Sequence, residues 1–479
     1  MDKTTPFTLI YGNGIGPEVM DATLRVLNSA NAKINPEVIE LDYNSLIKED
    51  EIKFPDSFWE SIKRTKIFLK APLNESENKY RRIDRFIKAK LSLYKSIFPF
   101  HQYIPLTEKQ NQNSDILIIT YDLTSNPTFQ YRQTQNVFHY TTSINVPDVT
   151  KIVQETYQIA SENNKNKISY IISQNNINLE DELFINTLTK LSKEYPNIKT
   201  EFISCKRFFY NLTDNIDNLE IILIQNNLFL LILDFLFRNK NLEGLYSIAQ
   251  FGEQYSVFQS LQDSMPEIAG KNLANPTGLI MASVLLLNFI GQTETAYKIY
   301  NAVLKTIAEG IHTRDIYKEG ISKELVGTQE FADAVINRLD YSINNINPLI
   351  SFPRKYIEEN EDIAYVSKEN KELIGVDIYL DWIKGTATDL GDMVKKIATE
   401  NLRLEFISNK GKIVYPNDNI ETLYSDQWLC RYLRKDIINV IKQPEITDLI
   451  SKLYDTGFEI IKIELLYNFD GKPGYFNIK

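Results

Sequence analysis

Residues 9–18 read LIYGNGIGPE, an apolar run that meets a glycine-rich turn and then a proline. Phe7–Tyr11 is typical of a buried strand, and Pro17 suits the first turn of a helix that extends to Ala30. A glycine loop between a strand and a helix can hold a phosphate at the helix N-terminus. The Gly-x-Gly-x-Gly spacing departs from the dinucleotide-binding fingerprint, however, and favours a plain tight turn.

Strands and amphipathic helices alternate up to residue 340, which predicts an α/β fold. Apolar, β-branched runs predict strands at residues 67–71, 116–119, 168–172 and 221–224. Helical periodicity predicts helices at residues 180–195, 293–309 and 328–339. The apolar stretches 219–237 and 279–290 are, respectively, too polar and too short to span a bilayer. The first is predicted to be a buried strand and helix, and the second a core helix.

Residues 341–364 are polar and irregular, with Pro348 and Pro353, and are the predicted linker. A second pattern follows in residues 365–479. Strands are predicted there at residues 373–382, 402–408, 412–415 and 460–466, and helices at residues 387–399 and 444–454. This arrangement predicts a compact C-terminal α+β domain.

The composition is that of an ordinary globular protein, with 43% hydrophobic and 24% charged residues among 479. A net charge of −10 argues against a nucleic-acid partner. No signal peptide or membrane span is recognised, so we expect a cytoplasmic protein with no membrane partner. Cys205 and Cys430 are the two cysteines, and their spacing indicates neither a disulfide nor a zinc site. Only 18 residues are glycine, which is few for a protein that must bring its backbone close to a nucleotide.

The glycine turn resembles the Gly-Asp-Gly-Ile-Gly-Pro-Glu signature of the isocitrate/isopropylmalate dehydrogenase family, with Asn13 in place of the aspartate. The resemblance continues through LKAPL (69–73), LSLYKSIFP (91–99), IAGKNLANPT (268–277) and NAVLKTIAEGIHTRD (301–315). The segments GVDIYLDW (375–382), ISNKGKIVYP (407–416) and FDGKPGY (469–475) resemble the C-terminal extension of long bacterial NADP-dependent isocitrate dehydrogenases. The resemblance therefore covers nearly the whole chain.

This resemblance implies an isocitrate/isopropylmalate dehydrogenase-like fold. A large α/β domain would comprise residues 1–110 and 250–340, and residues 111–249 would form a small α/β dimerisation domain. It also implies oxidative decarboxylation of isocitrate to 2-oxoglutarate in the tricarboxylic acid cycle, with NADP and Mg2+ or Mn2+. The family builds each active site from both subunits of a dimer. We therefore expect a homodimer, or a heterodimer with an intact paralogue.

The residues at the family's substrate positions have changed type. Cationic donors must hold the carboxylates of isocitrate, but the corresponding positions hold Arg82, Asp84, Lys88 and Phe98. Lys88 keeps a charge without the bidentate fork of an arginine, and is the substrate-binding remnant. The family's third arginine falls within residues 119–121, which contain none.

The family's acid/base residues are also missing. Its tyrosine falls at Asn126, and the lysine that it takes from the neighbouring subunit falls at Ser173. A serine without a partner base cannot transfer a proton at neutral pH. The sequence therefore predicts that no catalytic residue is intact.

The family's paired metal-binding aspartates fall at Leu230 and Asp234, or at Leu231 and Phe235 if one gap is allowed. The aspartate supplied by the other subunit falls near Lys206. A lone carboxylate, Asp234, would hold Mg2+ weakly. A residue on a helix surface is the alternative interpretation of Asp234.

The nucleotide loop reads QSLQDSMP (259–266), with Gln262 and Asp263 where the family has His-Gly. A carboxylate beside a diphosphate is repulsive. The cofactor-binding remnants are Gly270, Lys271, Asn272 and Asn275. A structural role at the start of a helix explains these four residues equally well. We expect neither NADP nor a metal ion to bind well.

Three interpretations remain open: an inactive paralogue with a regulatory or interaction role, a working isocitrate dehydrogenase whose alignment is misjudged, and new chemistry in the old cleft. The simultaneous loss of substrate clamp, metal pair, acid/base pair and nucleotide loop favours the first. His101, His139 and His312 show no triad or metal spacing, and are expected to be surface or hydrogen-bonded residues.

Overall fold

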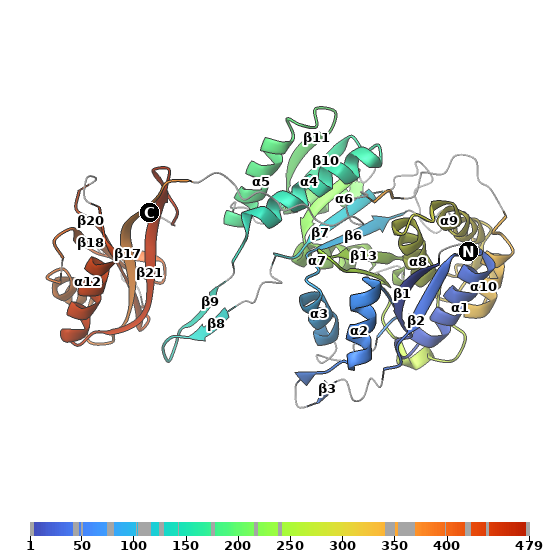
Figure 1. Cartoon of the computed structure of the whole chain (residues 1–479), viewed down its shortest axis with the longest axis horizontal. Helices are drawn as coiled ribbons and strands as arrows, with labels where there is room; N and C mark the ends of the chain where they lie inside the picture. Colours follow the sequence, from blue (N-terminus) through green and yellow to red (C-terminus); the bar gives the residue numbers. More distant parts are fainter. Residues whose placement is uncertain are drawn as a thin grey trace. The chain divides into compact units, whose positions relative to one another are not determined.

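The computed structural model describes residues 4–41, 47–48, 51–73, 81–101, 103, 116–123, 129–141, 143–173, 178–214, 219–237, 242–340, 350–352, 369–397, 399–416, 423–436 and 440–475. By their contacts the residues form two units (Figure 1). The first comprises Met1–Asn126 and Ile144–Ile363, and the second comprises Pro127–Ser143 and Ala364–Lys479.

A single ten-stranded sheet runs through the first unit, so the predicted large and small domains share one sheet. Its order is β11 (Lys199–Ser204), β10 (Lys167–Ile172), β12 (Ile221–Gln225), β7 (Ile116–Tyr121), β6 (Lys95–Phe100), β13 (Ser247–Phe251), β14 (Ser256–Ser260), β5 (Ile67–Lys70), β1 (Thr5–Ile10) and β2 (Ile34–Val38). The four strands at each end are parallel to one another. At the centre, β6 and β13 run antiparallel to both of their neighbours.

Helices cover this sheet on both faces, as expected for parallel strands joined by crossovers. They are α1 (Gly16–Ser29), α2 (Asp56–Thr65), α3 (Arg81–Lys90), α4 (Val146–Glu162), α5 (Leu179–Leu191), α6 (Cys205–Asp214), α7 (Asn226–Phe237), α8 (Thr277–Phe289), α9 (Thr293–Ala308) and α10 (Thr328–Ile336). Short pairs complete the unit: β3 (Ile47–Lys48) with β4 (Glu51–Ile52), and β15 (Ile311–His312) with β16 (Glu324–Leu325).

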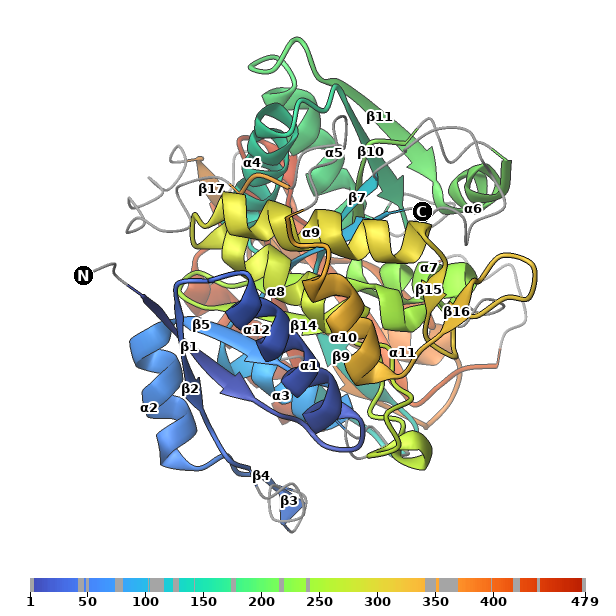
Figure 2. The same cartoon turned by 90° about the vertical axis from the view of Figure 1, so that its right-hand side faces the viewer.

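Helix α8 organises the core of the first unit. Every residue of α8 except Asn288 is buried, because the helix packs between β13 and β14 on one side and α1 and α9 on the other. Figure 2 shows α1, α9 and α10 as neighbours over this region. The prediction of a core helix in residues 279–290 is therefore confirmed, and so is the buried strand in residues 219–237. The helix predicted to be buried after that strand, α7, is partly exposed at Leu230 and Leu231.

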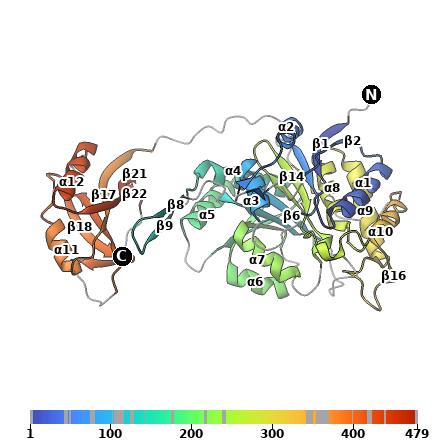
Figure 3. The same ribbon diagram turned by 90° about the horizontal axis from the view of Figure 1, so that it is seen from below.

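The second unit contains the predicted C-terminal domain. Its antiparallel sheet has the order β19 (Lys412–Tyr415), β18 (Leu402–Asn409), β20 (Gln427–Arg434), β17 (Lys371–Asp381), β21 (Glu459–Phe469) and β22 (Lys472–Pro473). Helices α11 (Ala387–Val394) and α12 (Gln443–Asp455) pack on one face of the sheet (Figure 3). Without the small strands β19 and β22, this is the split βαβ arrangement of ferredoxin-like folds. The helix predicted at residues 387–399 is shorter than expected, and β20 was not predicted.

The hairpin of β8 (Phe129–Arg132) and β9 (Phe138–Thr141) also belongs to the second unit. The Asn136 side chain donates to Asp426 Oδ2 at 3.1 Å, and the His139 ring lies 5.6 Å from the Tyr379 ring. Residues 127–143 therefore group with the C-terminal domain, and not with the rest of the predicted 111–249 domain. In the predicted linker, residues 350–352 pack on the first unit. Residues 341–349 and 353–368 lie outside the described part of the chain.

Candidate functional site

The backbone of two other loops, at Pro72 and Ser264, packs directly against the glycine turn between β1 and α1. Two of its backbone N–H groups donate to protein carbonyls: that of Asn13 to Pro72 O at 3.1 Å, and that of Ile15 to Ser264 O at 2.7 Å. A Cβ on Gly12 would lie 1.9 Å from Pro72 O, and a Cβ on Gly14 would lie 2.1 Å from Ser264 O. Close packing of three loops explains these glycines, which supports the tight-turn interpretation over a phosphate cradle.

Two charged side chains at the predicted substrate clamp, Asp84 and Lys88, are paired within the chain, and the side chain of Arg82 is outside the description. Lys70 Nζ lies 2.6 Å from Asp84 Oδ1, so Asp84 neutralises a buried lysine. Lys88 Nζ lies 3.8 Å from Asp122 Oδ2. Burial lowers the pKa of Lys88, and the carboxylates of Asp122 and Asp84 act in the opposite direction. The substrate-binding remnant is therefore a largely buried cation beside two carboxylates.

Phe98 is fully buried in an aromatic cluster. Its ring lies 5.4 Å from Phe229 and 5.6 Å from Tyr246, in edge or tilted contacts. Phe229 comes from α7, the helix on which the metal-binding pair was predicted to lie. The position expected to hold an arginine is thus occupied by core packing between β6 and α7, with no room for an arginine facing a ligand.

Ser173 has a carboxylate partner, which corrects the expectation that it has none. Its hydroxyl donates to Asp181 Oδ2 at 2.7 Å and accepts from Asn178 Nδ2 at 3.2 Å. Asp181 is fully buried and also accepts from the Tyr170 hydroxyl at 2.9 Å, which in turn bonds the Tyr121 hydroxyl at 3.1 Å. With its lone pairs taken by these donors, Asp181 is a structural acceptor that joins β10 to the start of α5.

The intact segment 270–275 is bound to neighbouring helices by its polar groups. The Asn272 side chain donates to Glu330 Oε2 at 2.7 Å and accepts from Gln329 N at 2.9 Å. The Asn275 amide donates to Asp315 Oδ2 at 3.0 Å. Burial raises the pKa of Asp315, against the hydrogen bonds from Thr313 and Asn275 that lower it.

The other two remnants in this segment play smaller parts. The Lys271 ammonium donates to Glu267 O at 2.8 Å, and Gly270 supplies a left-handed turn with φ +69°. A structural role at the start of α8 is therefore sufficient to explain Gly270, Lys271, Asn272 and Asn275.

Sequence reasoning missed two carboxylates near the cleft, Asp181 and Glu180, which both lie in the first turn of α5. Burial raises the pKa of Glu180, and Asp181 raises it further. A usable signal was present, because Asn178 is a good helix N-cap followed by three acidic residues, and its side chain accepts from Asp181 N. This pattern indicates a fixed helix start directly after the strand that carries Ser173.

Replacing Glu180 by glutamine is expected to stabilise the protein at about pH 7 and to leave stability unchanged near pH 4. The folded pKa of Glu180 lies above its unfolded value, so its contribution to stability is lost as pH rises through the folded pKa. Glutamine keeps the neutral form at every pH. Urea unfolding at both pH values measures the difference, with Glu182→Gln in the same turn, where the side chain is exposed, as the control. An unchanged or lower stability of Glu180→Gln at neutral pH would contradict the expectation.

Comparisons with known proteins now identify the chain's relatives. Residues 7–335 match the family described as isocitrate/isopropylmalate dehydrogenase, and residues 371–478 match the bacterial isocitrate dehydrogenase C-terminal domain. The chain belongs to the isocitrate/isopropylmalate dehydrogenase family. It is 34% identical to the NADP isocitrate dehydrogenase of Rickettsia bellii, over 99% of both chains.

Two further relatives place the chain within the family. A mitochondrial protein of Dictyostelium discoideum, named as a regulatory subunit of NAD isocitrate dehydrogenase, is 27% identical over 71% of this chain and 94% of that protein. The solved structure of the TT0538 protein from Thermus thermophilus superposes with a TM-score of 0.81 at 26% identity, covering 99% of this chain and 95% of that one. The predicted fold, an isocitrate/isopropylmalate dehydrogenase-like α/β fold with a C-terminal α+β domain, is therefore confirmed.

The residues at the family's metal positions do not fit a divalent cation. Leu230 and Leu231 are 53% and 54% exposed on α7, and Lys206 is exposed on α6. Asp234 lies on α7, and its side chain is outside the description. Within the described ranges, no group of three or more His, Cys, Asp or Glu residues could hold a metal ion. The leucines and the lysine offer none of the oxygen donors that Mg2+ or Mn2+ prefers, so Asp234 is the one carboxylate at these positions.

Several expectations from the sequence have individual outcomes. Asn126, the predicted tyrosine position, lies outside the described residues. Each histidine has a hydrogen-bonding partner: Ser322 for His312, Tyr300 for His101 and Gln427 for His139. Among the helices that the structure describes, none is both long and apolar enough to cross a bilayer.

Proposed function

We propose that this chain keeps the scaffold of an isocitrate dehydrogenase but has no isocitrate dehydrogenase activity, and serves a regulatory or interaction role. The packing of Phe98 against Phe229 and Tyr246 is the observation that carries this proposal. Binding of a tricarboxylate requires cationic donors at this position, and a buried aromatic cluster supplies none. The pairing of Lys70 with Asp84 supports the same conclusion, because a carboxylate already neutralises that lysine.

The relationship to a regulatory protein supports the kind of role proposed. The Dictyostelium discoideum relative with that name matches this chain over 71% of its length. This relative shows that a protein similar to this chain can carry the name of a regulatory subunit. For this chain we infer a dimer, either with itself or with an intact paralogue, and no strong binding of NADP or metal.

Purified protein is expected to show no isocitrate-dependent reduction of NADP with Mg2+ or Mn2+. An assay between about pH 6 and 9 tests this, with the Rickettsia bellii relative measured in parallel, and a turnover above about one per minute would refute the proposal.

Millimolar NADP is also expected to leave the melting temperature of the protein unchanged. A nucleotide at about 100 times its dissociation constant would stabilise the protein by about 2.7 kcal/mol. Turnover together with a thermal shift would instead support the interpretation as a working enzyme.

A mixed dimer with an intact paralogue is expected to have less than about half the activity of the intact homodimer. This chain would offer its partner Ser173 and Lys206 in place of the family's lysine and aspartate. Ser173 is already bound to Asp181, and Lys206 would place a positive charge beside the metal. Co-expression with two different tags, isolation of the doubly tagged dimer and an assay per dimer measure the effect. Full activity in the mixed dimer would show that the residues across the interface are not needed.

A further inference from the structure

A cavity of about 270 Å³ lies in the first unit, at the end of β6 and β7 away from Lys88 and Asp122. Phe100 and Ile116, which pair across these strands, line it. Lys88 and Asp122 lie near the other end of the same strands, where Lys95 pairs with Tyr121. Ligands of α/β sheets bind at the carboxyl ends of parallel strands, and this cavity adjoins the amino end of β7. It therefore lies at the other end of these strands from Lys88 and Asp122, and its wall residue Tyr246 also packs against Phe98.

Aromatic rings form one wall of the cavity. Phe100 stacks on Tyr246 with ring centroids 5.5 Å apart and planes at 10°, and Tyr103 meets Tyr246 edge-on at 5.5 Å. These rings are fixed by hydrogen bonds, since the Tyr103 hydroxyl donates to Leu245 O at 2.9 Å and the Tyr246 hydroxyl donates to His101 O at 3.0 Å. The wall is thus rigid and presents ring faces and edges that suit another aromatic ring.

Aliphatic side chains also line the cavity, with Met281, Val284 and Leu285 contributed by α8. Figure 1 shows α8 and α9 beside β13 and β6, and α9 adds Tyr300 to the lining. The Tyr300 hydroxyl lies 3.4 Å from His101 Nδ1, a long hydrogen bond between two groups that line the cavity. Polar residues also contribute to the lining, namely Asn163, Asn164, Lys165 and Ser247. A mainly apolar lining with some polar groups is the usual composition of a small-molecule site.

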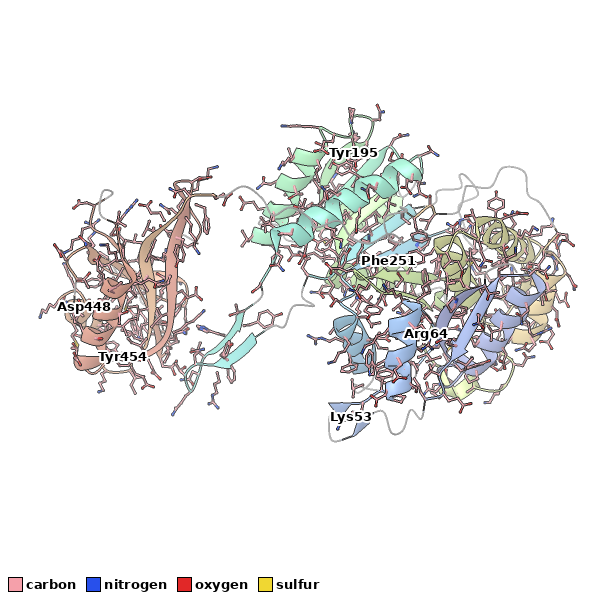
Figure 4. The ribbon with its side chains drawn as sticks, viewed as in Figure 1. Lys53, Arg64, Tyr195, Phe251, Asp448 and Tyr454 are labelled. Atoms are coloured by element: carbon pink, nitrogen blue, oxygen red, sulfur yellow. The ribbon has the colours of Figure 1, made fainter. Side chains whose placement is uncertain are left out.

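Residues 350–352 close one side. Ile350 lines the cavity, and its carbonyl accepts from the Asn288 side chain. Ser351 N donates to Asn163 Oδ1 at 2.7 Å, and Phe352 packs 5.5 Å from Phe251, the residue labelled over the sheet in Figure 4. These contacts hold residues 350–352 in place as a fixed part of the cavity's lining.

We infer that this cavity is a binding site for a small aromatic molecule of one or two rings that carries a single hydrogen-bonding group. An apolar cavity of about 150 Å³ stays dry and accommodates benzene, so the larger volume here leaves space for a second ring and a polar atom. The polar group would meet His101 and Tyr300, and the rings would pack between Tyr246 and Leu285. This inference does not depend on whether the family's cleft is active.

Indole is the probe that tests the inference, because it has two rings and one N–H donor. Titration of the full chain by calorimetry is expected to give a dissociation constant on the order of 0.1 mM. The melting temperature is expected to rise by about 2 °C at ten times that concentration. Absence of both heat and thermal shift up to millimolar indole would overturn the inference.

Leu285→Trp is expected to fill the cavity and to weaken indole binding at least about tenfold. Leu325→Trp introduces the same side chain at an exposed position and is the matched control, expected to bind like the wild type. Val284→Phe is a second filling variant, to be used if circular dichroism shows that Leu285→Trp does not fold. Equal binding by a folded filling variant and the control would place indole elsewhere and overturn the assignment.

Discussion

Gly12→Ala is expected to destabilise the first unit by more than about 4 kcal/mol, or to prevent its folding. The added Cβ would lie 1.9 Å from Pro72 O and 2.9 Å from Pro72 C, which are backbone atoms that cannot rotate away. In addition, φ at Gly12 is +67°, a left-handed conformation that alanine adopts only with strain. The loss of stability would be measured by urea unfolding and by the yield of folded protein.

Gly270→Ala is the matched control for this prediction. Gly270 has φ +69°, almost the same as Gly12, but no atom lies within 4 Å of its added Cβ. The control therefore carries the conformational penalty alone, about 1–2 kcal/mol. If the two variants were equally stable, the close contact of the turn with Pro72 would not exist in solution. The glycine turn would then again be open to a bound phosphate.

Asp377→Ala is expected to cost the second unit about 3–5 kcal/mol, because it removes the carboxylate that pairs with a buried guanidinium. Arg431 Nε and Nη2 each donate to a carboxylate oxygen of Asp377 at 2.7 Å. The two side chains are only 4% and 6% exposed. The guanidinium lies 5.1 Å from the Phe406 ring and 4.9 Å from the Tyr475 ring, so water cannot easily replace the lost carboxylate.

Asp448→Ala is the matched control on the surface of the same unit. Asp448 lies on α12 (Figure 4) and pairs with Lys452 at 2.7 Å, with side chains 52% and 46% exposed. Removal of this pair is expected to cost less than about 0.5 kcal/mol. Trp382 and Trp428 lie 5.5 Å apart in the second unit and report its unfolding by fluorescence. A cost below about 1 kcal/mol for Asp377→Ala would show that Arg431 reaches solvent.

Much of the fold could be predicted from local sequence. The C-terminal strands and helices fall close to their predicted positions, and residues 412–415 match β19 at both ends. Local patterns were less useful where the alternation of polar and apolar residues is weak. Strand β20 has the sequence QWLCRYLR, in which buried Arg431 interrupts the apolar set. In the sequence alone, an arginine indicates an exposed position. The pairing of Arg431 with Asp377 on the neighbouring strand β17 explains why it is buried.

For the candidate site, the positions of the residues could be predicted from the sequence, but their surroundings could not. The resemblance located Lys88, Phe98 and Ser173 by motif, and the structure places them in α3, in β6 and directly after β10. Their environments were not predictable, because the partners are distant along the chain. Lys70 pairs with Asp84 across 14 positions, and Phe98 packs against Phe229 from a helix far downstream.

The sequence by itself determined the family and many of its strands and helices, and it predicted which residue types stand where the resemblance places the family's polar cleft residues. These follow from periodicity, turn residues and residue type, which act over a few neighbouring positions. Only the tertiary structure decided that Ser173 has a buried carboxylate partner, that residues 127–143 join the C-terminal domain and that a cavity lies beneath α8. Hydrogen bonds, ion pairs and cavities depend on contacts between side chains that are distant along the chain. Only the folding of the whole chain determines which of these side chains come into contact.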